Sequence, residues 1–268
     1  MRSDSHSRIP VADRGVCIYH SSMRTSNNTV LITGGASGIG LALAVRFVNA
    51  GSTVIVCGRR EAKLREAKEI NGRLNTLVAD VSTSAGRAAL VESAQRDFPG
   101  LNVLVNNAGI QRRIRVADQE PWDATREELA TNLGAPIHLT RLLLPHLMSK
   151  PDAAIINITS GLAFAPLART PVYSATKAAL HSFTLSLRHQ LKDTPVKVIE
   201  IAPPAVDTDL GGPGLHTFGV NVDEFADAVF AKLAEEDLEI GYGFGEKART
   251  ASRAELDELF VRINAAQP

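Results

Sequence analysis

Short apolar runs alternate along this chain with longer segments of helical periodicity, and this alternation limits the fold more than any other feature. From residue 29 onward the runs have the length of strands, and the segments between them read as helices. Short apolar runs separated by helices are typical of a parallel sheet covered on both faces. The expected strands are residues 29–33, 54–57, 76–79, 103–105, 154–158, 196–201 and 239–242. We therefore predict an α/β protein with one doubly wound parallel sheet of about seven strands.

No repeat, low-complexity run or linker divides residues 29–268, which we expect to form a single domain. The helical region 121–149 is expected to bend around Gly134 and Pro136, since both residues disturb a helix. Residues 1–28 are polar and irregular and lack the apolar core of a secretory signal. We predict that they form a disordered N-terminal extension and that the functional chain starts near Met23.

The charge balance and the cysteines exclude several classes of protein. Lys plus Arg and Asp plus Glu both number 29, which gives no basic excess for nucleic acid. No apolar stretch approaches the roughly 20 residues of a membrane span. Cys17 and Cys57 have neither C-x-x-C spacing nor neighbouring histidine pairs, so we expect no metal site and no disulfide. These features predict a cytoplasmic protein.

Gly34, Gly38 and Gly40 lie between the first expected strand and its helix. Glycine allows a tight turn and a close approach by phosphate, and the amide groups and dipole at a helix N-terminus attract an anion. The spacing is G-x-x-x-G-x-G rather than G-x-G-x-x-G, but its position in a strand–turn–helix unit favours dinucleotide binding. The doubly wound domain is therefore expected to be a Rossmann fold.

Two arginines follow the second expected strand. In proteins that bind NAD, an acidic residue at this place accepts a hydrogen bond from the ribose 2′-hydroxyl. A guanidinium at Arg59 or Arg60 would instead pair with a 2′-phosphate. NADP(H) is thus the preferred cofactor, with NAD(H) as the alternative. Asp80 follows the third expected strand. It would either accept a hydrogen bond from the adenine amino group or cap the next helix.

Tyr173 and Lys177 are four residues apart in an expected helix, so their side chains share one face. A free tyrosine titrates near pKa ~10, and lowering this pKa by about three units requires roughly 4 kcal/mol. One close, desolvated cation supplies that energy. We expect Lys177 to lower the pKa of Tyr173 and make it an acid–base catalyst. The spacing alone also fits a surface Tyr–Lys pair.

These residues belong to an ordered series of motifs, and with it the chain resembles the short-chain dehydrogenase/reductase (SDR) family over residues 29–210. From Pro203 onward it is similar to a bacterial branch called DltE-like oxidoreductases. The motifs are T-G-G-A-S-G-I-G at 33–40, Asp80-Val81, N-N-A-G at 106–109, Asn132, Ser160 and Y-S-A-T-K at 173–177. The family usually has Pro-Gly where this chain has Pro203-Pro204, which predicts a locally different loop because proline fixes φ and lacks an N–H.

The resemblance implies an enzyme acting on CH–OH or C=O groups. Tyr173 would exchange a proton with the substrate oxygen, and Ser160 would hold that oxygen. Lys177 would also bond the nicotinamide ribose, and Asn132 would hold a water that connects Lys177 to solvent. The expected catalytic residues are Asn132, Ser160, Tyr173 and Lys177. The expected cofactor contacts are Gly34, Ser37, Gly38, Ile39, Gly40, Arg59, Arg60, Asp80, Val81, Asn107, Ala108, Gly109, Tyr173, Lys177, Pro203, Val206 and Thr208.

The substrate is not identified beyond a small carbonyl or alcohol compound. The glycine-rich substrate-loop region, about 204–222, reads either as a mobile lid or as a turn-rich connector. Apolar residues that could line the site weakly suggest an apolar substrate, and no arginine is clearly dedicated to a substrate carboxylate. The candidate lining residues are Leu162, Phe164, Leu167, Leu215 and Phe218.

Two other functions remain open. A 3-oxoacyl-thioester reductase would need a basic patch near the pocket mouth, which Arg112, Arg113 and Arg115 could form. A non-catalytic NADP(H)-sensing regulator would need the fold but not the Tyr173–Lys177 pair. The resemblance further implies a homodimer or homotetramer, because the helices around Asn132 and Tyr173 often pair between subunits in this family.

Overall fold

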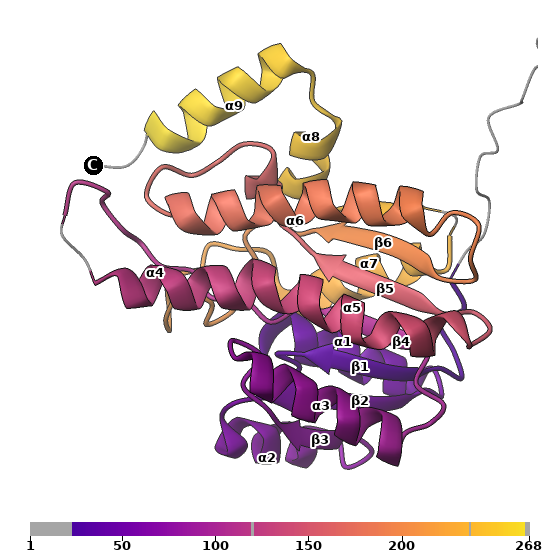
Figure 1. Ribbon diagram of the computed structural model, residues 1–268. Coiled ribbons are helices and arrows are strands. Elements are labelled where there is room, and N and C mark those ends of the chain that lie inside the picture. Colours follow the sequence, from indigo (N-terminus) through magenta and orange to yellow (C-terminus); the bar gives the residue numbers. More distant parts are fainter. Residues whose placement is uncertain (1–22, 119–120, 236, 266–268) are drawn as a thin grey trace, which may run out of the picture.

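The computed structural model describes residues 23–118, 121–235 and 237–265, and within these residues seven parallel strands form one sheet. The strand order is β3-β2-β1-β4-β5-β6-β7, so the chain reverses direction across the sheet between β1 and β4 (Figure 1). The strands are β1 (Thr29–Thr33), β2 (Thr53–Gly58), β3 (Asn75–Val78), β4 (Val103–Asn106), β5 (Ala154–Ile158), β6 (Lys197–Ala202) and β7 (Glu239–Gly241). The predicted doubly wound Rossmann fold is confirmed.

Helices cover both faces of this sheet. In Figure 1 the helices α3, α5 and α6 lie in front of the strands, and α1 and α7 lie behind them. Val30 and Ile32 pack into the cluster that includes side chains of α1, α2 and α7, whereas Leu31 packs into the cluster with α3, α5 and α6. The alternation of side chains along β1 therefore supplies two separate cores. The helices are α1 (Gly38–Asn49), α2 (Glu61–Ile70), α3 (Ser84–Asp97), α4 (Trp122–Leu129), α5 (Ala135–Met148), α6 (Pro171–Gln190), α7 (Val222–Leu233), α8 (Phe244–Thr250) and α9 (Arg253–Ala265).

The expected bend in the helical region 121–149 is a single π-helical turn. Residues Ala130–Gly134 form this turn between α4 and α5, and Pro136 lies in the first turn of α5. A π-helical turn accommodates an extra residue within a helix and is frequent at functional sites. It turns the side chain of Asn132 into the buried interior.

Residues 23–28 pack against the domain, although we expected them to belong to the N-terminal extension. The side chain of Met23 is 3% exposed and lies in the core beside α1. Asn28 accepts a 2.9 Å hydrogen bond from the Asn102 side chain. The rest of the expected extension, residues 1–22, lies outside the described residues. Across the part of the chain that is described, none of the helices is long and apolar enough to cross a lipid bilayer.

Candidate active site

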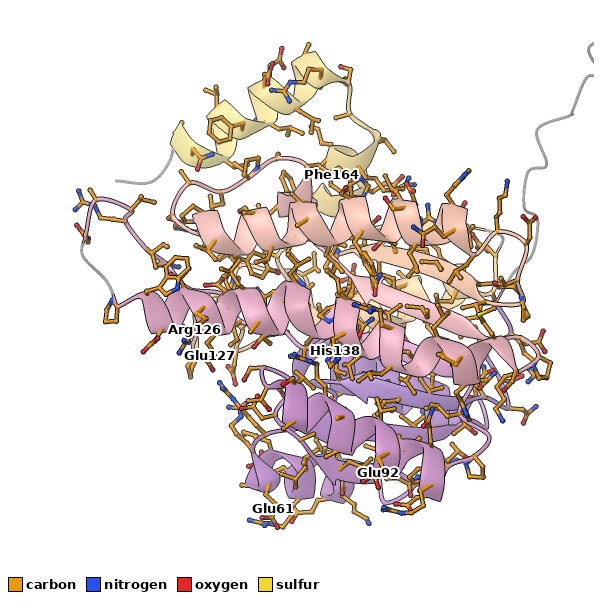
Figure 2. The ribbon with its side chains drawn as sticks, viewed as in Figure 1. Glu61, Glu92, Arg126, Glu127, His138 and Phe164 are labelled. Atoms are coloured by element: carbon orange, nitrogen blue, oxygen red, sulfur yellow. The ribbon has the colours of Figure 1, made fainter. Side chains whose placement is uncertain are left out.

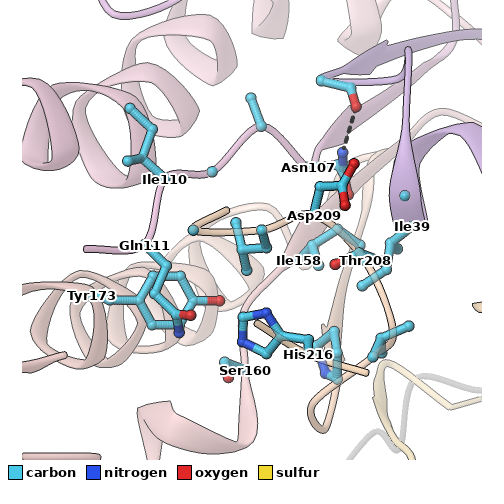
Figure 3. A pocket seen from close by; sticks show the side chains of 18 of the residues that line it. Ile39, Asn107, Ile110, Gln111, Ile158, Ser160, Tyr173, Thr208, Asp209 and His216 are labelled. Atoms are coloured by element: carbon cyan, nitrogen blue, oxygen red, sulfur yellow. Dashed lines mark hydrogen bonds between the residues drawn. The ribbon is translucent and has the colours of Figure 1, made fainter. Parts of the chain in front are cut away.

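One cavity of about 980 Å³ opens at the carboxyl ends of the strands, beside the neighbouring strands β1 and β4, where the strand order reverses. Ligands of open α/β sheets bind at this point, because the connections from neighbouring strands lead to opposite faces there. Of the expected catalytic residues and cofactor contacts, only Gly40 and Asn132 do not line the cavity. The sheet thus brings together side chains from Gly34 to Thr208. Figure 3 shows a group of them.

The glycine turn between β1 and α1 forms one wall of the cavity. Gly34 and Gly38 have φ angles of +63° and +54°, which favour glycine. A Cβ atom at Gly34 would lie 2.9 Å from the Cα of Ala108, so glycine also allows the loop after β4 to approach. Ser37 caps α1 without a side-chain hydrogen bond, and the first turn of α1 carries no acidic residue. The amide groups there suit the pyrophosphate of a dinucleotide, so these residues fit the expected cofactor.

Asn107 fixes the glycine turn to β4. Its Nδ2 donates hydrogen bonds to the carbonyl oxygens of Thr33 (2.9 Å) and Gly34 (3.2 Å), while its backbone N–H donates to Thr33 Oγ1 (3.0 Å). We expected Asn107 to lie along the adenosine ribose. The residue does line the cavity, and its side-chain amide is used to hold the loop that approaches the phosphates.

Arg59 lines the cavity but is not free. It donates a hydrogen bond to Glu127 of α4, and Arg112 binds the other oxygen of the same carboxylate at 2.5 Å. Glu127 projects from α4 on the side facing β2 and α2 (Figure 2). The hydrogen bonds from Arg59 and then Arg112 hold the pKa of Glu127 below its ordinary value. No local pattern in the sequence predicts that Arg59 and Arg112 share the carboxylate of Glu127. Arg60 and Lys63 add two further cations to this part of the cavity.

Asp80 does not cap α3, and its hydrogen bond to the adenine amino group stays a prediction. It lines the cavity, and its Oδ1 accepts a 2.9 Å hydrogen bond from the backbone N–H of Ser82 ahead of α3. Thr83, not Asp80, caps that helix, because Thr83 Oγ1 accepts a hydrogen bond from Gly86 N at 3.0 Å. Burial opposes ionisation of Asp80, but the hydrogen bonds from Ser82 and the charge of Arg59 leave its pKa lowered.

Tyr173 and Lys177 are both buried on the side of α6 that faces the cavity. Lys177 Nζ donates a 2.7 Å hydrogen bond to the carbonyl oxygen of Ile158 and lies 5.5 Å from the centre of the Tyr173 ring. Ser160 follows β5 and accepts a 3.1 Å hydrogen bond from the backbone N–H of Leu162. These three side chains, 17 residues apart at most in sequence number (177 − 160), therefore meet at one end of the cavity.

The expected lowering of the Tyr173 pKa is wrong for this structure. Burial raises the pKa of Tyr173 to about 12, and the nearby carboxylate of Glu128 acts in the same direction, while hydrogen bonding with Ser160 opposes the shift. Burial also lowers the pKa of Lys177 to about 8. Desolvation disfavours the charged form of both groups, and here it outweighs their attraction.

Asn132 lies behind the cavity wall and braces the loop after β4. Its Oδ1 accepts a 2.8 Å hydrogen bond from Ile110 N, and its Nδ2 donates to Ile110 O at 2.7 Å and to Thr176 Oγ1 at 3.2 Å. We expected Asn132 to hold a water beside Lys177. That role stays a prediction. The direct hydrogen bonds of its side chain to the loop and to α6 give it a positioning role as well.

The substrate-loop region is anchored at its base. Val206 and Val220 form an isolated parallel bridge, and Asp207 N donates a 2.9 Å hydrogen bond to Val220 O. Among the apolar residues expected near the substrate, Leu162, Leu167 and Phe218 line the cavity, whereas Phe164 and Leu215 do not. Polar residues missed by the sequence analysis also line it, namely Gln111, Arg169, Asp209 and His216, together with Arg113 of the expected basic patch.

Comparison with known proteins agrees with this geometry. The family model for short chain dehydrogenases matches residues 28–215. An uncharacterized oxidoreductase DltE of Bacillus subtilis is 49% identical over 251 residues, which covers 91% of this chain and 100% of the relative. The NADP-dependent 3-hydroxy acid dehydrogenase YdfG of Escherichia coli K12 is 34% identical over 178 residues, or 66% of this chain and 72% of that protein.

A solved structure of a short chain dehydrogenase from Burkholderia cenocepacia in complex with NADP superposes with a TM-score of 0.79 at 26% identity, covering 92% of this chain and 100% of that one. The chain therefore belongs to the short-chain dehydrogenase family, in its DltE-like branch. It is an oxidoreductase, and its cavity fits the nicotinamide cofactor of that family. No cluster of three His, Cys, Asp or Glu side chains able to hold a metal ion occurs in the described ranges.

Proposed function

We propose that the protein transfers hydride between NADP(H) and a carbonyl or secondary alcohol substrate, with Tyr173 as general acid and base. The observation that carries this proposal is the meeting of Ser160, Tyr173 and Lys177 in the same cavity as the glycine turn and Arg59. The family relatives named above include one NADP-dependent dehydrogenase and one structure with bound NADP, which supports the choice of cofactor.

The protonation state of Tyr173 suits the role of proton donor in carbonyl reduction. Tyr173, with a pKa of about 12, is a neutral phenol near pH 7 and can donate its proton to the alkoxide oxygen that develops during reduction. Ser160 supplies a second hydroxyl to hold this oxygen. The nicotinamide supplies the hydride. Lys177 would hold the nicotinamide ribose, and its positive charge near Tyr173 would stabilise the phenolate left after proton transfer.

Specificity for the 2′-phosphate is proposed to come from the cations after β2. Arg59, Arg60 and Lys63 line the cavity there, and β2 ends in Cys57-Gly58 without an acidic residue that would prefer a ribose hydroxyl. NADPH and NADH titrations followed by fluorescence test this idea. Arg59→Ala is expected to weaken NADPH binding about tenfold or more, the size of a lost charge-assisted hydrogen bond, with little change for NADH.

Arg65→Ala is the matched control, because Arg65 pairs with Glu61 on α2 and does not line the cavity. A clear preference of the wild-type protein for NADH would refute the role of Arg59. Absorbance assays at 340 nm with a panel of ketones and aldehydes then test turnover. Binding of NADPH without turnover of any carbonyl compound would favour the NADP(H)-sensing regulator instead.

The 3-oxoacyl-thioester reductase is less well supported than it was by the sequence. Arg112 is engaged by Glu127, and Arg115 does not line the cavity, so only Arg113 of the expected basic patch faces the site. A phosphate group of a carrier would therefore contact only Arg113 of the three arginines. We retain the small-molecule carbonyl reductase as the proposed function.

We also propose that the protein is a cytoplasmic homodimer or homotetramer. The support is the exposure of large apolar side chains on α4, α5 and α6, the helices around the catalytic residues. Trp122 is 66% exposed, Met148 46% and Leu185 41%. Light scattering coupled to size-exclusion chromatography measures the assembly directly, and a monomer at micromolar concentration would contradict it.

A further inference from the structure

We infer that Arg113 and Arg169 bind the carboxylate of an oxo acid substrate whose carbonyl group lies against Tyr173. Both arginines line the cavity that holds Ser160 and Tyr173. This inference rests on the proposed function and adds to it a class of substrate, together with two residues that select it. The sequence analysis assigned no role to Arg169 and considered Arg113 only as part of a basic patch for a carrier phosphate.

The fold places these two arginines together although 56 residues separate them (169 − 113). Ile114 N donates a 3.1 Å hydrogen bond to the carbonyl oxygen of Arg169, which ties the loop after β4 to the loop before α6. Arg169 directly precedes Thr170, the residue that caps α6, and Tyr173 is one turn further along. A group bound by Arg169 is therefore held at the same end of α6 as the catalytic hydroxyl.

The two guanidinium groups have no acidic partner in the described part of the chain. The ion pairs of the structure include Arg46, Arg59, Arg112, Arg188 and Arg249, but neither Arg113 nor Arg169. Arg169 Nε is buried and has no hydrogen-bond acceptor among the described residues. A buried donor without an acceptor costs free energy. A carboxylate in the cavity would give the two unpaired guanidinium groups a charge-assisted partner.

The surrounding charges agree with an anion site. Burial, and after it the positive charge of Arg113, lowers the pKa of Arg169. Burial also lowers the pKa of His216, and Arg113 and Arg169 add to this effect, while the backbone of Leu210 and the carboxylate of Asp207 oppose it. Both arginines therefore act electrostatically on His216, which lines the same cavity. Asp207 and Asp209 line the cavity as well, but neither forms an ion pair with these arginines.

The carbonyl end of the substrate would meet the remaining polar groups. Gln111 and His216 project into the cavity near Tyr173 and Ser160 (Figure 3). In the reaction the oxo acid accepts hydride from NADPH at its carbonyl carbon and a proton from Tyr173 at its oxygen. The products are the hydroxy acid and NADP⁺, and solvent returns the proton to Tyr173. The carboxylate is unchanged, so its role is to orient the substrate.

The test compares 3-oxobutanoate with its methyl ester, which has the same carbonyl group but no charge. Wild-type protein is expected to reduce the acid with a kcat/KM at least about tenfold higher. Arg113→Ala and Arg169→Ala should each lower kcat/KM for the acid by about 10- to 100-fold, mainly through KM, and change that of the ester little. Arg115→Ala is the matched control from the same loop, because it is exposed and does not line the cavity.

Three outcomes would overturn the inference and leave the proposed function standing. These are equal turnover of acid and ester, equal losses for both substrates in the arginine variants, and a preference for dihydroxyacetone phosphate, which would assign the arginines to a phosphate. If neither substrate is turned over, the calorimetric affinity of 3-hydroxybutanoate for the protein with saturating NADP⁺ decides. Affinity that is lost in Arg169→Ala supports the carboxylate site even where the reductase proposal fails, and the absence of binding overturns the inference.

Discussion

Asn132 holds the main chain of Ile110 at both of its polar atoms, with hydrogen bonds of 2.8 Å to the amide nitrogen and 2.7 Å to the carbonyl oxygen. The same side chain reaches Thr176 of α6. It therefore joins the loop that follows β4 to the helix that carries Tyr173 and Lys177. The side chain is completely buried, so water cannot replace these bonds without a rearrangement.

Removing this brace should reduce both stability and activity. Asn132→Ala leaves the amide and carbonyl of Ile110 without partners, and we expect the free energy of unfolding to fall by about 2 kcal/mol or more. Asn132→Asp keeps an acceptor for Ile110 N but loses the donor to Ile110 O. Urea denaturation measures the stability of both variants, and fluorescence titration measures their affinity for NADPH. Wild-type stability in Asn132→Ala would show that the two hydrogen bonds contribute nothing.

Glu127 should compete with the 2′-phosphate of the cofactor for Arg59. The side chain of Arg59 is 54% exposed and that of Glu127 is 30% exposed, and solvent-accessible ion pairs contribute about 0.2–1 kcal/mol. Glu127→Gln removes the competing charge, so we expect the dissociation constant of NADPH to fall by about two- to fivefold and that of NADH to stay the same. Fluorescence titration measures both values.

The control for Glu127 is Asp123→Asn on the same helix, since Asp123 pairs with Arg126 and not with a residue that lines the cavity. Weaker NADPH binding in Glu127→Gln would contradict competition between Glu127 and the 2′-phosphate for Arg59. In that case Glu127 would orient Arg59 for the phosphate.

Much of this fold and site follows from local patterns. The apolar runs predict the strands because a parallel sheet buries both faces. The glycine turn predicts the cavity wall that suits the pyrophosphate, because Gly34 and Gly38 adopt positive φ angles. Tyr173 and Lys177 share a helix face at a fixed spacing. These features depend on neighbours within a few residues, so the sequence contains them directly.

The remaining features depend on tertiary contacts. The bonds of Asn132 require a π-helical turn, whose extra residue is stabilised by Ile110 from another part of the chain. Arg113 and Arg169 meet only through the packing of two loops. The pKa of Tyr173 depends on how completely the side chain is buried, and residue spacing does not report burial.

His181 should stabilise the protein in a pH-dependent way. Its Nδ1 lies 2.8 Å from Glu200 Oε2, and Glu200 also accepts a 2.7 Å hydrogen bond from Thr159, which precedes Ser160. The bond to Glu200 raises the pKa of His181 against the effect of burial. A raised folded-state pKa means that the stabilisation is complete below the ordinary histidine pKa of about 6.5 and is lost as the pH rises through the folded-state value.

Chemical denaturation of the wild-type protein and of His181→Gln at pH 6 and at pH 8.5 measures this contribution. We expect the difference in unfolding free energy between the two proteins to be larger at pH 6. His189→Gln is the control, because His189 is also on α6 and no ion pair of it is seen among the described residues. A difference that grows toward pH 8.5 would contradict the assignment.

Tyr173 is proposed to transfer the proton that accompanies hydride transfer, and the Tyr173→Phe variant tests this role. The variant keeps the ring that packs in the cavity and removes only the hydroxyl. NADPH oxidation at 340 nm is measured with the best carbonyl substrate of the wild-type protein, beside NADPH binding by fluorescence. We predict that kcat falls by about 10²- to 10⁴-fold while the dissociation constant of NADPH changes less than about threefold. Turnover at the wild-type rate in Tyr173→Phe would show that Tyr173 does not transfer the proton.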